Sequence, residues 1–138
     1  MSIKKERVAL SILLLLMLTI SCGTDPQDKM IGTWKTLDKD GQSITITLLV
    51  DHSASLSEGG IVVINDSLYE SVQWIFKSDK DPMQLDITST SNGKERDSKM
   101  IVRFLSEDKI EIRYPDESGN RPKEFEKYHE LQQIFMRH

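Results

Sequence analysis

The sequence contains a single cysteine, Cys22, in 138 residues. A disulfide within the chain needs two cysteines, and the common zinc sites need several Cys or His ligands at short spacing. The three histidines, His52, His129 and His138, have no histidine three or four residues away with which to share a metal. We interpret them as surface or turn residues. The sequence therefore predicts neither a metal site nor a cofactor.

Positive charge is also scarce, because 18 Lys and Arg stand against 22 Asp and Glu and give a formal net charge of −4. Nucleic-acid binding, and electrostatic binding to anionic lipid, both require clustered Lys and Arg. Motifs for catalysis are missing as well. His52 and the nearby serines lie in a polar segment, Asp51–Gly60, without a Gly-x-Ser-x-Gly motif. We interpret this segment as a solvated loop, and we expect neither a nucleic-acid partner nor an enzyme.

Long apolar runs are confined to the N-terminus. One run extends from Val8 to Ile20, directly after three basic residues, and is shorter than the ~20 apolar residues that a membrane-spanning helix needs. A basic segment, a short apolar segment and a small residue before a cleavage site are typical of a secretory signal peptide. Residues 1–21 are therefore predicted to direct export and to be removed.

The end of this signal, Leu18-Thr19-Ile20-Ser21-Cys22, resembles the lipobox of bacterial lipoproteins, although Thr19 stands where strict lipoboxes carry Leu. The resemblance implies that Cys22 becomes the first residue of the mature protein and carries a diacylglyceryl group and an N-acyl chain such as palmitate. Two or more acyl chains hold a protein firmly to a membrane. We expect a lipid-anchored protein of the bacterial cell envelope, in the outer or the inner membrane. Secretion with a free thiol and an uncleaved anchor are the alternatives.

Removal of residues 1–21 takes away three basic residues and one acidic residue, which leaves a formal charge of −6. Residues 22–30, which begin with the lipidated cysteine, are polar, contain Pro26 and predict a short tether. Residues 31–138 have a size suited to one domain with its own hydrophobic core.

From residue 31 onward, apolar and polar residues alternate in short segments, which is the pattern of β-strands with one buried face. The clearest segment runs from Ile44 to Val50. Further strands are expected at residues 61–64, 72–76, 83–88, 100–104 and 110–114. Asn92-Gly93 is typical of a type I′ hairpin turn. About eight short strands joined by such turns predict an all-β, antiparallel barrel or sandwich.

The last segment, Glu124–Arg137, is ambiguous, because its apolar residues fit either helical spacing or strand alternation. We favour a strand, since an up-and-down barrel needs its last strand to pair with its first.

Three short motifs resemble those of known barrels. Gly32-Thr33-Trp34 resembles the Gly-x-Trp start of lipocalin-like barrels, in which the indole plugs one end and stacks on an arginine of the last strand, here Arg137. Pro82-Met83-Gln84-Leu85-Asp86 and Arg121-Pro122-Lys123-Glu124-Phe125 resemble two motifs of an uncharacterised bacterial lipocalin-like domain family. That family's Gly-Ile-Tyr segment is replaced here by Lys99-Met100-Ile101-Val102. The resemblance implies an up-and-down lipocalin-like barrel over residues 31–138, and it supplies no activity.

Two functions are compatible with such a domain. In the first, the barrel interior binds a small apolar or amphipathic molecule. The inward-facing candidates for contact with it are Ile46, Leu48, Val72, Trp74, Leu85, Val102 and Ile112. In the alternative, the barrel is packed solid, and the protein is a structural or interaction lipoprotein whose loops Asp51–Gly60 and Pro115–Pro122 engage another envelope protein. Alternation predicts that two charged strand residues, Asp86 and Arg103, face outward.

Overall fold

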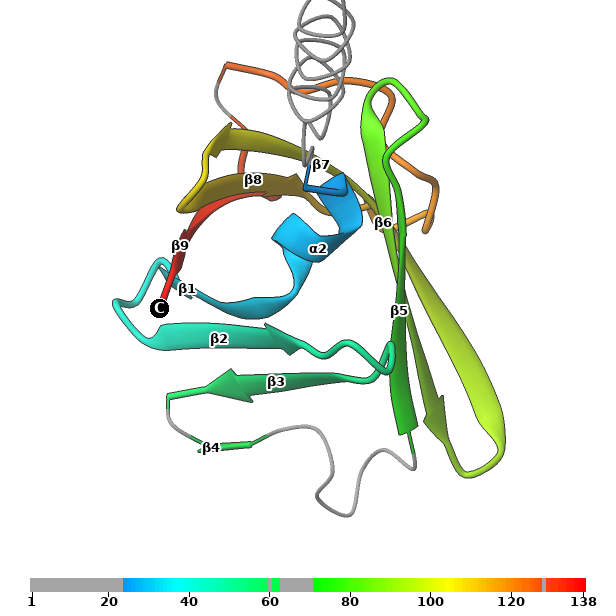
Figure 1. The fold of residues 1–138 in the computed structure, drawn as a ribbon. Coiled ribbons are helices and arrows are strands. Elements are labelled where there is room, and N and C mark those ends of the chain that lie inside the picture. The colour runs from blue at the N-terminus through cyan, green and yellow to red at the C-terminus, as the bar shows by residue number, and fades with distance from the viewer. Residues whose placement is uncertain (1–23, 60, 63–70, 128) are drawn as a thin grey trace, which may run out of the picture.

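Short antiparallel strands account for most of the fold. The computed structural model describes residues 24–59, 61–62, 71–127 and 129–138, and in it the strands form one sheet rolled into a nearly closed barrel (Figure 1). The strands are β1 (Gly32–Leu37), β2 (Ser43–Leu48), β3 (Ala54–Glu58), β4 (Ile61–Val62), β5 (Ser71–Lys77), β6 (Met83–Ser91), β7 (Lys94–Ser106), β8 (Lys109–Arg113) and β9 (Gln132–Arg137). Their order around the sheet is β4-β3-β2-β1-β9-β8-β7-β6-β5. The predicted all-β, up-and-down barrel is confirmed.

The predicted signal peptide and Cys22 lie outside the described residues. Among the residues that are described, no helix has the length and apolar character needed to cross a bilayer.

Alternation along each strand determines which side chains fill the barrel. On β5, for example, Val72, Trp74 and Phe76 are buried while the residues between them are exposed. The β6–β7 hairpin turns at Asn92 and Gly93, whose φ angles of 51° and 70° are those that a type I′ turn requires. The hairpin signal in the sequence is therefore confirmed.

The first and last strands close the barrel. β1 pairs antiparallel with β9, with Trp34 opposite Arg137 and Lys35 opposite Met136. The strand predicted at the end of the chain is thus present, although it occupies only Gln132–Arg137.

The remaining seam lies between β3 and β5. Ser53 and Gln73 form a β-bridge across it, and the Trp74 backbone N–H donates to the His52 carbonyl oxygen at 2.8 Å. The Trp74 indole N–H donates to the Leu49 carbonyl oxygen at 3.0 Å. The turn that precedes β3 therefore carries the contacts that fasten this seam.

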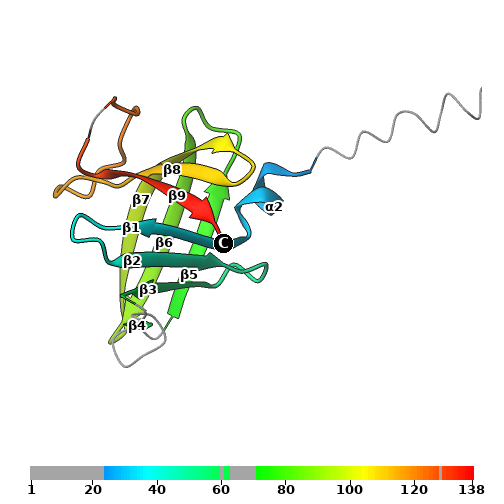
Figure 2. The same ribbon diagram turned by 90° about the vertical axis from the view of Figure 1, so that its left-hand side faces the viewer.

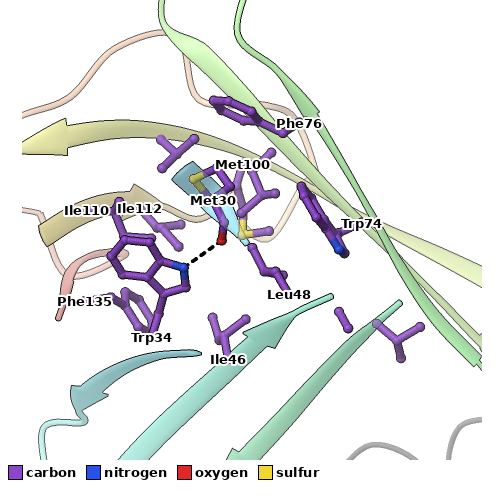
Figure 3. Packing of buried hydrophobic residues seen from close by; sticks show 14 residues of the cluster. Met30, Trp34, Ile46, Leu48, Trp74, Phe76, Met100, Ile110, Ile112 and Phe135 are labelled. Carbon is purple, nitrogen blue, oxygen red and sulfur yellow. Dashed lines mark hydrogen bonds between the residues drawn. The ribbon is translucent and has the colours of Figure 1, made fainter. Parts of the chain in front are cut away.

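A short helix, α2 (Pro26–Met30), occupies part of the segment for which the sequence predicts a tether. Asp25 caps it by accepting a hydrogen bond from the Gln27 N–H, and Pro26 is its first residue, where a missing N–H is tolerated. Its last residue, Met30, is fully buried in the core (Figure 3). The folded domain therefore begins before residue 31, because burying the Met30 side chain favours order in the preceding turn.

Two polar segments form strands that the sequence analysis did not predict. Ala54–Glu58 lies within the predicted loop Asp51–Gly60, but it forms β3 and pairs with β2 in register. That part of the loop prediction is wrong, because Ala54 and Leu56 supply a buried face between the serines. β7 begins at Lys94 rather than near residue 100, since the preceding hairpin turn aligns its polar start with β6.

Candidate functional site

A cavity of about 290 Å³ opens at one end of the barrel. Most of its wall is apolar and comes from the inward faces of β2, β3, β5, β6 and β7. Its lining residues are Ile44, Ile46, Ala54, Ser55, Leu56, Glu58, Val72, Ile87, Ser98, Met100, Tyr114 and Gln133.

Strand register places the cavity at the end opposite α2. Gly32, which follows α2, pairs with Leu48 at the end of β2. The cavity residues Ile44 and Glu58 pair with each other at the other end of this strand pair, near the start of β2 and at the end of β3. Figure 2 shows α2 and the C-terminus at one end of the barrel and the β1–β2 turn at the other. The barrel is therefore closed at the α2 end and hollow at the other.

Five side chains in the wall are polar: Ser55, Glu58, Ser98, Tyr114 and Gln133. Burial raises the pKa of the Tyr114 phenol well above its usual range, and the negative charge of Glu58 raises it further. The phenol is therefore neutral at physiological pH and can both donate and accept a hydrogen bond. The cavity thus combines an apolar body with a small polar region.

The seven residues predicted to face a ligand divide into two groups. Ile46 and Val72 line the cavity. The other five are buried in the packed part of the core and are absent from the cavity wall: Leu48, Trp74, Leu85, Val102 and Ile112. They lie nearer the closed end of their strands, where Met30 and Trp34 fill the barrel (Figure 3).

Several wall residues were missed because the prediction considered only apolar side chains near the middle of each strand. The same alternation extends to the strand ends, where Ser98 lies two residues before Met100 and Tyr114 two residues after Ile112. That pattern could have identified them. Nothing in the sequence indicated Glu58, because the strand that carries it was expected to be a loop.

The closed end is built around Trp34, whose indole N–H donates to the Met30 carbonyl oxygen at 2.9 Å. The Arg137 guanidinium lies 4.2 Å from the centroid of the Trp34 ring. It also donates to the carbonyl oxygens of Lys29 at 2.6 Å and Ile31 at 3.0 Å. The two residues named by the lipocalin-like resemblance are therefore in contact and cover this end.

Gly32 allows this arrangement for two reasons. Its φ of +133° is one that residues with a side chain rarely adopt, and a Cβ at this position would lie 2.8 Å from Arg137 Nη1. The glycine of the Gly-x-Trp motif therefore leaves room for the arginine that stacks on its tryptophan.

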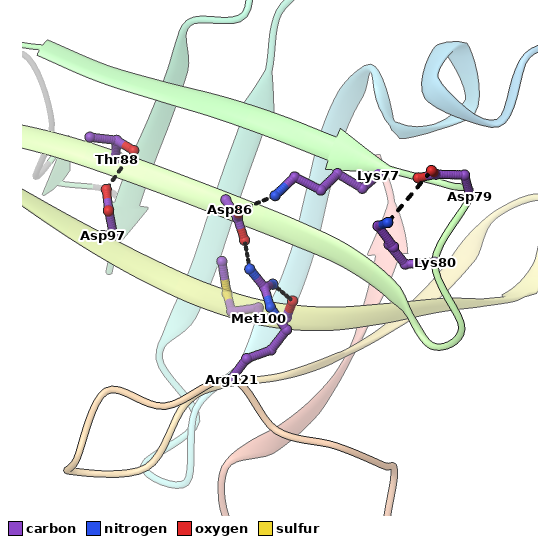
Figure 4. A network of polar contacts seen from close by, with 8 residues as sticks. All are labelled: Lys77, Asp79, Lys80, Asp86, Thr88, Asp97, Met100 and Arg121. Atoms are coloured by element: carbon purple, nitrogen blue, oxygen red, sulfur yellow. Dashed lines mark hydrogen bonds and ion pairs between the residues drawn. The ribbon is translucent and has the colours of Figure 1, made fainter.

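The other two motifs meet on the outer surface of the barrel. Asp86 of β6 accepts a hydrogen bond from Arg121 at 2.5 Å and one from Lys77 at 3.1 Å (Figure 4). Arg121 also donates to the Met100 carbonyl oxygen at 2.7 Å. The Asp86 side chain faces outward, as alternation predicts, and its partner fastens the loop that follows β8 to the barrel wall.

Arg103 makes a second contact with the segment that follows β8, closer to β9 than Arg121 is. The Arg103 guanidinium lies 4.4 Å from the Phe125 ring centroid and 2.5 Å from a carboxylate oxygen of Glu111. Arg103 thus also faces outward, as predicted. The predicted loop Pro115–Pro122 is irregular in structure, and the Arg121–Asp86 ion pair holds it to the barrel wall.

In the described part of the chain, no three His, Asp or Glu side chains lie close enough together to hold a metal ion. No protein-family model matches the chain, and neither a curated protein nor a solved structure matches it. The lipocalin-like family therefore stays a prediction from the motifs.

Proposed function

We propose that this protein is a lipid-anchored lipoprotein of the bacterial cell envelope whose barrel binds a small apolar or amphipathic molecule. The observation that supports ligand binding is the cavity of about 290 Å³ at the end of the barrel opposite α2. Protein interiors are close-packed and contain few voids larger than a water molecule, so an apolar hollow of this size leaves room for a ligand.

The size of the cavity limits the ligand. Small-molecule sites usually enclose about 300–1,000 Å³, so this cavity is at the lower limit. The ligand is therefore a short molecule, such as a medium-length alkyl chain with a polar group, rather than a complete phospholipid.

The lipid anchor is supported by the sequence and by the place where the domain begins. The lipobox-like segment ends at Cys22, and α2 starts at Pro26. A cleaved and lipidated chain would therefore pass almost directly from its acyl chains into the folded domain.

Native mass spectrometry tests the ligand hypothesis. The Cys22→Ser form, purified gently from its own host without detergent, should carry a reproducible extra mass that disappears on denaturation. Ser98→Leu, which places an isobutyl group in the cavity, should abolish that mass. Ser57→Leu is the matched control, because Ser57 lies on β3 but is not part of the cavity wall. A bare mass in all forms contradicts ligand binding.

The second candidate is an interaction lipoprotein, and one observation favours it. Several apolar side chains on the outside of the barrel are about half exposed, among them Ile75 on β5 and Ile134 and Met136 on β9. If the purified protein gains the mass of a whole protein instead of a small molecule, this second function is the correct one.

A further inference from the structure

The charge on the described part of the cavity wall is of one sign. Glu58 is the only charged residue among the described residues of the wall, and the other polar wall residues carry none at neutral pH. Residues 60 and 63–70 include Asp66 and Glu70 but no Lys, Arg or His. That stretch therefore cannot supply a positive charge.

Beyond Ser98, the next residue on the inward face of β7 is a cation, Arg96, which precedes that wall residue by two positions. Arg96 is exposed and does not belong to the cavity wall. A negatively charged head group in the cavity would thus meet a carboxylate and no cation from the described wall.

Glu58 and Tyr114 mark where a polar head group would lie. Glu58 ends β3, at the end of the barrel where the cavity opens, and its side chain is exposed to solvent. Tyr114 lines the same cavity, and the charge of Glu58 acts on its phenol. A carboxylate and a neutral phenol can together accept two hydrogen bonds from one ammonium group. The apolar wall formed by Ile46, Val72 and Met100 would then surround the rest of the ligand.

We infer that the cavity selects a short amphiphile with a cationic amine head group and disfavours one with a carboxylate head group. This inference rests on the proposed ligand-binding function and adds the charge of the ligand. An ammonium group is attracted to the Glu58 carboxylate, whereas a ligand carboxylate is repelled by it. Because Glu58 lies near water, which weakens interactions between charges, both the attraction and the repulsion are moderate.

Three probes of equal chain length separate charge from hydrophobicity: octylamine, 1-octanol and octanoate. Isothermal titration calorimetry on the Cys22→Ser full chain at neutral pH should give an affinity for octylamine about ten-fold higher than for octanoate, with 1-octanol between them. Glu58→Gln should reduce this ratio to within about two-fold while leaving the affinity for 1-octanol unchanged. Binding of 1-octanol therefore also shows that the variant is folded. Glu58→Lys should reverse the order of octylamine and octanoate.

Glu107→Gln is the matched control, because Glu107 is an exposed glutamate in the β7–β8 turn at the closed end of the barrel. It removes the same charge and should leave all three affinities unchanged. Octanoate binding as tightly as octylamine, or a Glu107→Gln effect as large as that of Glu58→Gln, overturns the inference and leaves the proposed function intact. If none of the three probes binds, the proposed function fails, and the inference fails with it.

Discussion

Arg137, the next-to-last residue of the chain, stacks its guanidinium on the indole of Trp34, with 4.2 Å between the guanidinium carbon and the ring centroid. The two residues are direct partners across the pairing of β1 with β9. This contact joins the two ends of the domain, and the same guanidinium donates to carbonyl oxygens beside α2. It therefore links strand closure to the covering of the barrel end.

A double-mutant cycle measures this link. Trp34→Ala should lower the free energy of unfolding by about 3–5 kcal/mol, because it removes a fully buried indole. Arg137→Ala should also destabilise, and the double variant should lose about 1 kcal/mol less than the sum of the single losses. Denaturant unfolding of all four proteins gives the coupling. Strict additivity would mean that the stacking contributes nothing.

Gly32→Ala should destabilise the protein more than Gly41→Ala. Both glycines have positive φ, but the φ of +133° at Gly32 lies far outside the left-handed α region, whereas the φ of +78° at Gly41 lies beside it, so the backbone strain of about 1–3 kcal/mol is larger at Gly32. Only at Gly32 does the new Cβ also approach Arg137. The excess loss at Gly32 should therefore shrink when Arg137 is already Ala. The same denaturant series tests this, and an excess of unchanged size in the Arg137→Ala background would remove the arginine from the explanation.

Asp86→Asn should loosen the loop after β8 without unfolding the barrel. The substitution breaks an ion pair with Arg121 in which both side chains are less than one-fifth exposed, which costs about 1–3 kcal/mol locally. Hydrogen exchange should accelerate in residues 115–127 and stay unchanged in β1 and β2. Asp79→Asn is the control, because its ion pair with Lys80 is largely exposed (Figure 4) and contributes little.

Because of Tyr114, the free energy of unfolding should fall at alkaline pH. Its pKa in the folded state lies above its ordinary value of 10.0, so the unfolded chain loses the phenol proton first as the pH rises. Stability from this residue is therefore complete below about pH 10 and declines above it by about 1.4 kcal/mol per pH unit. Tyr114→Phe should remove that part of the decline. Equal slopes for the two proteins between pH 10 and 11 would contradict the pKa shift.

Cys22 should carry the lipid. Cells fed a radioactive or alkyne-tagged palmitate should label the normal protein, and Cys22→Ser should abolish the label because no other cysteine exists. Cys22→Ser should also move the protein from the membrane to a soluble envelope fraction. Label retained in Cys22→Ser, or membrane association that persists at high salt, would contradict lipidation at this residue.

Local signals in the sequence predicted the strands well where apolar alternation was complete. The Asn92-Gly93 turn and the alternating residues of β2 and β5 are examples, because turn geometry and one buried face are properties of neighbouring residues. β3 was missed since its inward residues, Ala54, Leu56 and Glu58, include only one large apolar side chain. Its pairing with β2 supplies the order that its own sequence does not indicate.

The site was less predictable than the fold. The Asp86–Arg121 contact joins two motifs 35 residues apart, and nothing in either motif alone shows that they meet. The cavity depends on how far α2 and Trp34 fill the barrel from one end. Alternation places Leu85 and Ile87 on the same inward face, but only the three-dimensional packing distinguishes the filled level at Leu85 from the hollow level at Ile87.

The hydrogen bond from Arg137 to the Lys29 carbonyl oxygen also determines how a lipid-anchored domain would be oriented relative to the membrane. It fixes α2 at the closed end of the barrel, and only three residues separate α2 from Cys22. Four residue steps span at most roughly 14 Å. With Cys22 in the bilayer, the closed end must therefore rest near the lipid surface while the cavity mouth points into the aqueous space. Such a protein would collect its ligand from solution rather than from the membrane beneath it.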